Sequence, residues 1–420
     1  MLKVLKNKKL LSILGPGILV AATGVGAGDL ATAAFAGTKI GLIVLWAVVL
    51  GAFFKFVLTE GLARWQLATG TTLLEGVMHH LGRPTLVIFL IYFFVWSFLV
   101  AAALMSACGA AAQAIYPLTD DPVTGKIIYG IIHSLIGLFL VIKGGYRLFE
   151  KVMTVGIGLM FITVITTAIL LEPDWSEVIK GLFWPRLPQF GVELAWTIAL
   201  IGGVGGTVTI LSYGYWIKEE KRNEPKDLAI CRLDLAIGYI MTALFGIAMV
   251  IIGHRIQVEG SGAALIIRLA EMLVNEIGLV GQWFFLIGAW GAIFSSLLGV
   301  WQSVPYLFAD VWHLIRFDTN QPQLVEHTID TDSNDYRWYL YALALIPMLG
   351  LWIGFANMQK FYAIVGALFI PMLALTLLLL NGRTQWIGSQ YRNRPLTTLI
   401  LIFILVFFLI AGGLTVWKVF

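Results

Sequence analysis

The stretch Gly15–Asp29, GPGILVAATGVGAGD, decides the fold of this chain. Together with the apolar residues that follow it to Thr38, it is long enough to cross a bilayer, which takes about 20 residues. Its middle is a poor helix, because three closely spaced glycines each weaken helix propensity by about 1 kcal/mol. A carboxylate at that depth costs at least ~2–3 kcal/mol. Unwound backbone at membrane depth must be buried in protein or line a cavity, so the stretch predicts a broken helix with a binding site at Asp29.

Glycine packing against a neighbouring helix is the other interpretation of this stretch, with Asp29 near a surface. Packing explains the glycines but leaves the acid unexplained, so we favour the binding site. The composition agrees with a membrane setting: 59% of the 420 residues are hydrophobic, 12% are charged and the mean hydropathy is +0.88. These values predict an all-α polytopic membrane protein, because the apolar segments are too long and uniform for barrel strands.

We expect one transmembrane domain over residues 1–420, with no cleavable signal and no soluble module. The lipid bilayer is then the surrounding partner, and we expect neither a cofactor nor an obligate protein partner. The chain predicts eleven spans, near 13–38, 42–68, 86–114, 126–142, 152–171, 193–217, 229–253, 279–308, 338–356, 361–381 and 396–417.

Lysine and arginine are distributed unevenly between the alternate loops. The loops on the side of the amino terminus carry 19 of them, and the loops on the other side carry 8. Because positively charged loops tend to stay in the cytoplasm, we expect a multi-pass inner-membrane protein with its amino terminus in the cytoplasm and its carboxyl terminus outside. The basic runs therefore indicate topology, and no aromatic interleaving among them indicates nucleic-acid binding.

A second glycine cluster interrupts the expected sixth span, WTIALIGGVGGTVTILSYGYWIKEE. The first and sixth spans are five apart, so two repeats are expected at about 13–171 and 193–381, with an extra helix at 396–417. An odd number of helices per repeat inverts the second copy in the membrane. Interruptions at corresponding positions of two halves point to a midplane site between inverted repeats. The expected fold is a LeuT-type 5+5 inverted repeat with an eleventh helix.

Several parts of the sequence resemble the Nramp family of divalent metal transporters. GPG at 15–17, ATAAFAG at 31–37 and ARWQLATG at 63–70 fall in register with the opening of that family. GGTV at 205–208 resembles the family's entry into its second broken helix. The resemblance implies a secondary transporter that works by alternating access, with its substrate at the breaks of helices one and six.

The chain departs from the family's pattern at the site itself. Where the family has Asp-Pro-Gly-Asn in the first helix, this chain has Gly26, Ala27, Gly28 and Asp29. Where it has Met-Pro-His-Asn in the sixth helix, this chain has TILS at 209–212. The metal-binding Asp and the soft thioether are therefore missing. The candidate substrate-binding residues are Gly26, Ala27, Asp29, Gly205, Gly206, Thr209 and Ser212, of which Asp29 and Thr209 are the candidate metal ligands.

Two substrate classes remain open. One carboxylate with hydroxyls and backbone carbonyls is a hard oxygen site, which suits a divalent ion such as magnesium or manganese that keeps much of its water. Alternatively, the amino ends of the half-helices suit the anionic part of an amino acid or a small carboxylate. Asp29 then faces an amine or carries a proton. Family resemblance favours the metal, and the lost ligands favour the organic solute.

Coupling by the family's usual route is not expected. The family's third helix carries acidic residues that resemble a proton path, whereas residues 85–114 here contain no ionisable Asp, Glu, Lys, Arg or His. The candidate substitutes are Lys55, Glu60 and Glu193. A lysine in mid-span must pair or reach water, and it can serve as a fixed cation in place of a coupling ion. Structural pairing of Lys55 with Glu60 is the alternative, and Glu60 and Arg64 are spaced as a helical ion pair.

Other classes of protein fit the sequence less well. A transport-inactive sensor or scaffold would be favoured by long soluble tails, and a channel by a ring of like charges. An enzyme is not expected, because no nucleophile, base or metal triad is apparent. The glycines of the sixth span have no preceding strand, which argues against a nucleotide-binding loop.

Overall fold

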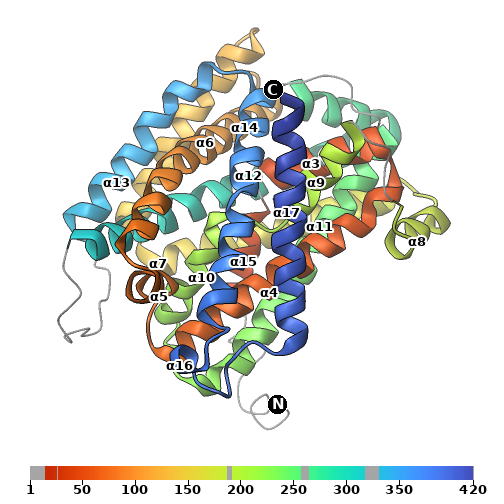
Figure 1. Cartoon of the computed structure of the whole chain (residues 1–420). Coiled ribbons are helices and arrows are strands. Elements are labelled where there is room, and N and C mark those ends of the chain that lie inside the picture. The colour runs from red at the N-terminus through yellow and green to blue at the C-terminus, as the bar shows by residue number, and fades with distance from the viewer. Residues whose placement is uncertain (1–14, 26, 187–191, 257–263, 317–330, 420) are drawn as a thin grey trace.

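Long helices make up nearly the whole chain. The computed structural model describes residues 15–25, 27–186, 192–256, 264–316 and 331–419. Figure 1 shows the helices gathered into one bundle, with α8 projecting from one edge and α16 at the lower end. The segments are α2 (Pro16–Gly24), α3 (Ala27–Ile40), η2 (Leu42–Val44), α4 (Leu45–Thr69), α5 (Leu73–Leu81), α6 (Arg83–Ile115), α7 (Pro122–Leu170), α8 (Trp175–Phe183), α9 (Val192–Gly203), η3 (Val208–Leu211), α10 (Ser212–Glu219), η4 (Pro225–Asp227), α11 (Leu228–Ile256), α12 (Ala264–Arg316), α13 (Asn334–Leu345), η5 (Ile346–Trp352), α14 (Phe355–Ala367), α15 (Phe369–Leu380), α16 (Thr384–Ile387) and α17 (Pro395–Val419).

Eight stretches of the described chain are long and apolar enough to cross a bilayer. They are Leu42–Thr69, Arg83–Ile115, Pro122–Gly144, Lys151–Leu170, Trp196–Glu219, Pro225–Arg255, Gly278–Arg316 and Asn357–Leu380. These correspond to the expected spans two to eight and ten. The expected first span is divided between α2 and α3, the ninth between α13 and η5, and the eleventh is α17. Helices therefore make up most of each expected span where the structure describes it, and the first and sixth spans are interrupted between α2 and α3 and between α9 and η3.

The helical segment α7 contains two of the expected spans. His133 and Gly156, 23 positions apart, both lie against the middle of α12, at Trp290 and Gly291 respectively. Four residues after His133, Gly137 lies against Leu297 and Trp301, which are nearer the carboxyl end of α12. Seven residues after Gly156, Thr163 lies against Gly288, which is nearer the amino end of α12. The two arms of α7 therefore run in opposite directions, as two consecutive spans must.

Close backbone contacts join the first and seventh spans on both sides of the first break. A Cβ on Gly17 in α2 would lie 2.6 Å from the carbonyl carbon of Asp234, and one on Gly37 in α3 would lie 2.9 Å from the amide nitrogen of His254. Small residues of this kind let membrane helices approach closely where no hydrophobic driving force is available. Both halves of the broken first helix are consequently held against α11.

The two ends of the bundle are distinguished by short helices. His80 of α5 stacks on Trp386 of α16, with ring centroids 4.2 Å apart, so both short helices mark one end of the molecule. We call this end the α16 side. The opposite end carries α8, which packs on η2 at the start of α4, and Gly181 lies against the carbonyl of Leu42 there.

Candidate functional site

The first expected break lies between α2 and α3. Helix α2 ends at Gly24, Val25 leaves the helical conformation, and α3 begins at Ala27. Gly26, one of the candidate site residues, lies outside the described residues, as do the side chains of Ala27 and Asp29. The backbone of Ala27 and Asp29 belongs to the first turn of α3. The first turn of a helix is the end at which unpaired N–H groups and the positive end of the dipole favour an acid.

The second expected break lies between α9 and α10. Helix α9 ends at Gly203, and a short 3-10 turn, Val208–Leu211, precedes α10. Gly205 and Gly206 have φ angles of 82° and 84°, a conformation that residues with a Cβ rarely adopt. The glycine cluster therefore ends the helix because it allows a left-handed backbone in the middle of a span.

The two breaks touch each other in the interior. A Cβ on Gly24 would lie 2.5 Å from the carbonyl carbon of Gly205 and 2.8 Å from the amide nitrogen of Gly206. The tenth span also reaches this point, since a Cβ on Gly366 in α14 would lie 3.0 Å from Thr207. Trp96 of α6 donates its indole N–H to the Thr207 hydroxyl at 3.0 Å. The sequence predicted the two breaks, and the structure shows that they abut.

Hydroxyl groups with unused hydrogen-bonding capacity lie next to the breaks. Thr23 Oγ1, in the last turn of α2, and Ser212 Oγ, in the first turn of α10, are buried and have no hydrogen-bond partner within the described structure. Thr209 is also buried, at 5% exposure, and its Oγ1 lies 2.7 Å from the position that a Cβ on Gly206 would take. Buried polar groups are normally paired, so unpaired hydroxyl oxygens beside a helix break are available to a ligand.

Lys55 reaches the second break from α4. Its side chain is fully buried, and its Nζ donates to the carbonyl oxygen of Gly202 at 2.9 Å and to that of Gly206. Gly202 is in the last turn of α9, and Gly206 is in the unwound stretch that follows. A cation is thus built into the carbonyl end of the broken sixth helix.

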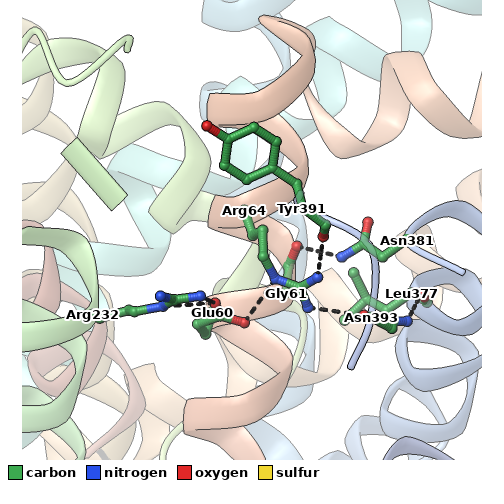
Figure 2. Close-up of polar contacts among 8 residues, drawn as sticks. All are labelled: Glu60, Gly61, Arg64, Arg232, Leu377, Asn381, Tyr391 and Asn393. Carbon is green, nitrogen blue, oxygen red and sulfur yellow. Dashed lines mark hydrogen bonds and ion pairs between the residues drawn. The ribbon is translucent and has the colours of Figure 1, made fainter. Parts of the chain in front are cut away.

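Glu60 and Glu193, the other candidate coupling residues, lie away from the breaks. Glu60 accepts from Arg64 at 3.2 Å and from Arg232 at 2.7 Å, so two guanidinium groups engage its carboxylate (Figure 2). The i,i+4 pair expected between Glu60 and Arg64 is confirmed. Glu193 is exposed in the first turn of α9, about 15 Å along the helix from Gly203.

The Glu60 cluster ties three parts of the α16 side together (Figure 2). Arg64 of α4 also donates to the carbonyl of Tyr391 at 2.5 Å and to Asn393 Oδ1 at 2.9 Å, both in the segment before α17. Asn381 returns a bond to the carbonyl of Gly61 at 2.8 Å. The cluster therefore connects α4, α11 and the segment between α15 and α17.

Asp234 is a buried acid that the sequence analysis did not single out. It lies near the start of α11 and accepts from the backbone N–H of Gly17 at 2.9 Å, at the amino end of α2. Arg222 donates to it at 2.8 Å and Tyr213 of α10 at 3.3 Å. These contacts bind α2, α10 and α11 to one another on the α16 side.

Asp310 is a second buried acid that was missed. It lies in α12, at 2% exposure, and accepts from the hydroxyl of Tyr215 in α10 at 2.5 Å and from that of Thr72 at 3.2 Å. Its neighbours on α12 make further bonds to α10. Trp216 donates to Gln302 at 2.9 Å, and Tyr306 donates to Glu219 at 3.1 Å. Both missed acids carry the signal that identified Asp29, an ionisable residue inside an apolar run.

An all-α membrane protein with two abutting broken helices belongs to the class of LeuT-type transporter folds. The sequence matches the family described as natural resistance-associated macrophage protein-like (Nramp) over residues 17–418. The chain belongs to the Nramp family, which is a family of transporters, so the expected fold and family are confirmed.

Relatives of this chain are distant. An uncharacterised protein of Pasteurella multocida is 22% identical over 64% of this chain and 63% of its own length. The divalent metal cation transporter MntH of Staphylococcus saprophyticus is 26% identical over 48% of this chain. That match covers only 44% of the length of MntH.

Two solved structures share the fold at low identity. The Eremococcus coleocola manganese transporter has a TM-score of 0.74 and 17% identity, covering 96% of this chain and 86% of its own. MhsT in complex with L-phenylalanine has a TM-score of 0.62 and 15% identity, covering 96% of this chain and 98% of its own. The same fold thus occurs in one neighbour named for a metal and in another bound to an amino acid.

Proposed function

We propose that this protein is a secondary transporter that carries a divalent metal ion through a site at the breaks of the first and sixth spans. The observation that carries the proposal is the meeting of the two breaks at Gly24 and Gly205, beside the unpartnered hydroxyls of Thr23 and Ser212. We propose that Asp29, whose backbone lies in the first turn of α3, supplies the carboxylate of this site. Hard oxygen ligands of this kind favour a strongly hydrated ion such as magnesium or manganese.

An organic solute with an anionic group is the second candidate substrate, and Lys55 favours it. The ammonium group of Lys55, which lies at the second break, repels a divalent ion bound beside it. The same ammonium attracts a carboxylate, and the amino end of α3 adds N–H groups beside the break. Membership of the Nramp family and the similarity to the divalent metal cation transporter MntH favour a metal ion as the substrate.

We propose that transport occurs by alternating access, with α12 moving against a group formed by α2, α4, α10 and α11. Ion pairs at Glu60 and Asp234 hold this group together on the α16 side. The contacts between α10 and α12 include hydrogen bonds from Tyr215 and Trp216 of α10 and from Tyr306 of α12, and the rings of Tyr215 and Tyr306 stack with centroids 5.9 Å apart. A hydrogen bond contributes less to stability than a buried ion pair costs to break, so we propose that this interface is the one that opens.

We propose that the α16 side faces the cytoplasm of a cell with an inner membrane. Loops on this side carry the larger share of Lys and Arg, which is the bias of cytoplasmic loops. The amino terminus is then cytoplasmic and the carboxyl terminus is outside. Opening of the α10–α12 interface would connect the site to the cytoplasm.

Calorimetry tests the proposed substrate directly. Purified protein is titrated with magnesium, manganese and cadmium, and then with amino acids and small carboxylates. We expect magnesium or manganese to bind, and Asp29→Ala to weaken that binding by at least about tenfold, or ~1.4 kcal/mol, because the site loses its carboxylate.

Glu193→Ala is the matched control, since it removes an exposed acid at the far end of α9. Circular dichroism and gel filtration verify that the variants remain folded. Unchanged metal affinity in Asp29→Ala would remove Asp29 from the site. No heat with any metal, together with heat from one organic solute, would establish the second candidate.

A further inference from the structure

The carbonyl end of the broken sixth helix is built as a cation site. The last four C=O groups of a helix have no intrahelical partner, and they form the negative end of its dipole. In α9 these groups include the carbonyl of Gly202. The left-handed turn at Gly205 and Gly206 brings the carbonyl of Gly206 to the same point, because one Nζ atom reaches both oxygens.

Half-helix carboxyl ends and unwound carbonyls coordinate the coupling sodium ion or proton in transporters with broken helices. Here the cation comes from the protein. Lys55 has no exposed surface, and its aliphatic stem runs past the break, since a Cβ on Gly205 would lie 3.5 Å from Lys55 Cγ. Its head is therefore directed at the carbonyls, and the side chain does not snorkel to a membrane surface.

We propose that Lys55 is a tethered ion that permanently fills a monovalent-cation site at the break between α9 and α10. The site would accept sodium or a small ammonium ion if the lysine side chain were removed. The break then needs no dissolved cation in the natural protein. Resting on the proposed transporter function, a further consequence is that uptake runs equally well in sodium and in choline.

Ordinary structural pairing is the competing explanation. Glu60 is more than one turn away along α4 and is engaged by Arg64 and Arg232. Lys55 Nζ instead donates to the carbonyls of Gly202 and Gly206. If Lys55 only stabilised packing, shortening its side chain would leave an apolar cavity. The melting temperature of such a variant would then be the same in salts with different cations. A cation site would instead discriminate between cations.

Thermal unfolding of purified Lys55→Ala separates the two explanations. The wild-type protein and the variant are melted in choline chloride, sodium chloride and methylammonium chloride at equal ionic strength. We expect the wild-type melting temperature to be the same in all three salts. The variant should melt several degrees lower in choline, and sodium or methylammonium should restore part of that loss in a saturable manner, because they bind the vacated carbonyls.

Thr59→Val is the matched control on the same helix. Thr59 Oγ1 lies 2.7 Å from the hydroxyl of Tyr239 and donates to the backbone carbonyl of Lys55 at 2.7 Å, so this variant loses two buried polar contacts but keeps the ammonium group. It should melt lower than wild type in every salt, without discrimination between cations. Equal melting temperatures of Lys55→Ala in choline, sodium and methylammonium would overturn the proposal.

A variant that aggregates still gives a result. In that case, solubilisation of Lys55→Ala is repeated in each of the three salts, and the yield of monodisperse protein replaces the melting temperature. Recovery only in sodium or methylammonium supports the tethered ion, and aggregation in all three overturns it. Because no substrate is present, these outcomes are independent of whether the calorimetry finds a metal.

Discussion

By sequence resemblance, Thr209 occupies the position of the methionine in the family's sixth helix. A substitution at this residue therefore gives a direct test of metal binding. Thr209→Met should strengthen cadmium binding by about tenfold, or ~1.4 kcal/mol, because a soft sulfur ligand favours transition metals over hydrated hard ions. The added side-chain volume opposes this gain, since overpacking costs ~1–3 kcal/mol. Calorimetry with cadmium, manganese and magnesium measures the change in affinity.

Thr209→Leu separates the effect of sulfur from that of size. Leucine is close to methionine in volume but has no metal-binding atom, so it should weaken the binding of all three ions. If Thr209→Met and Thr209→Leu behave alike toward cadmium, Thr209 does not face the metal. The organic solute then becomes the better candidate.

The sequence identified some of the buried charged residues and not others. An acid inside an apolar run was recognised at Asp29, yet the same signal at Asp234 and Asp310 was passed over because neither lies beside a glycine cluster. Lys55 was recognised as an unusual intramembrane cation. Its partners include backbone carbonyls 147 and 151 positions away, and no side-chain pattern encodes those.

Helix α10 bonds to α11 through Tyr213 and to α12 through Tyr215. This difference predicts which of its two interfaces opens. Tyr215→Phe removes the hydroxyl that Asp310 accepts, so it should loosen α10 from α12 and open the α16 side more often. Ser303→Cys is a suitable reporter, since Ser303 is buried on α12 with an unpartnered hydroxyl, one turn from Tyr306. Labelling of this cysteine by a water-soluble maleimide should become faster by about twofold to twelvefold, for the loss of ~0.5–1.5 kcal/mol.

Tyr213→Phe is the control for that experiment. It is the same substitution two residues earlier on α10, but the Tyr213 hydroxyl bonds to Asp234 inside the group of helices that we expect to move together. Its effect on labelling of Ser303→Cys should be small. Cys108 and Cys231 are both buried, so they add little background. Equal acceleration by the two variants would contradict the proposed moving interface.

The helices and their breaks were largely predictable from the sequence, because the length of an apolar run and a glycine cluster each determine the structure of their own segment. Both helix breaks occur at the glycines that predicted them, and helices make up most of each expected span where it is described. The turn between the fourth and fifth spans was expected as a loop near residues 143–151. Helical backbone continues through it in α7, and only contacts with α12 show that the chain reverses there. Direction reversal is a tertiary property, which hydropathy does not record.

The Glu60 cluster spans a large part of the molecule, so its loss should be felt in global stability. Glu60→Gln leaves Arg64 buried without its acid and removes the link from α4 to Arg232. We expect the free energy of unfolding to fall by about 2–3 kcal/mol, less than the ~3–5 kcal/mol typical of a fully buried pair, because the side chain of Arg232 is 47% exposed. A fall in the melting temperature measures it.

Glu193→Gln changes an exposed glutamate at the opposite end of the sixth span and should leave the melting temperature nearly unchanged. The same Glu60→Gln sample should keep its metal affinity, since the cluster lies away from both breaks. A stable Glu60→Gln protein with altered substrate binding would instead return Glu60 to the coupling role considered for it.

For the whole molecule, the architecture followed from composition, span count and the position of two glycine clusters. The assignment to the Nramp family followed from short motifs in the first 75 residues and in the sixth span, and the match over residues 17–418 confirms it. The expected repeat boundaries, near 13–171 and 193–381, stay a prediction. Substrate identity could not be read from the sequence, because in the register that the resemblance implies, the family's metal-binding motif residues are replaced in this chain.

The backbone contact between Gly24 and Gly205 affects how a map of substitution tolerance would be interpreted. Every other amino acid at Gly24 places a Cβ 2.5 Å from a main-chain atom, and main chain cannot move aside by changing rotamer. Saturation mutagenesis scored by the amount of folded protein in the membrane would therefore find Gly24 intolerant. A position that contacts the solute should instead keep its amount of folded protein and lose uptake, so both quantities should be measured and only their difference assigned to the site.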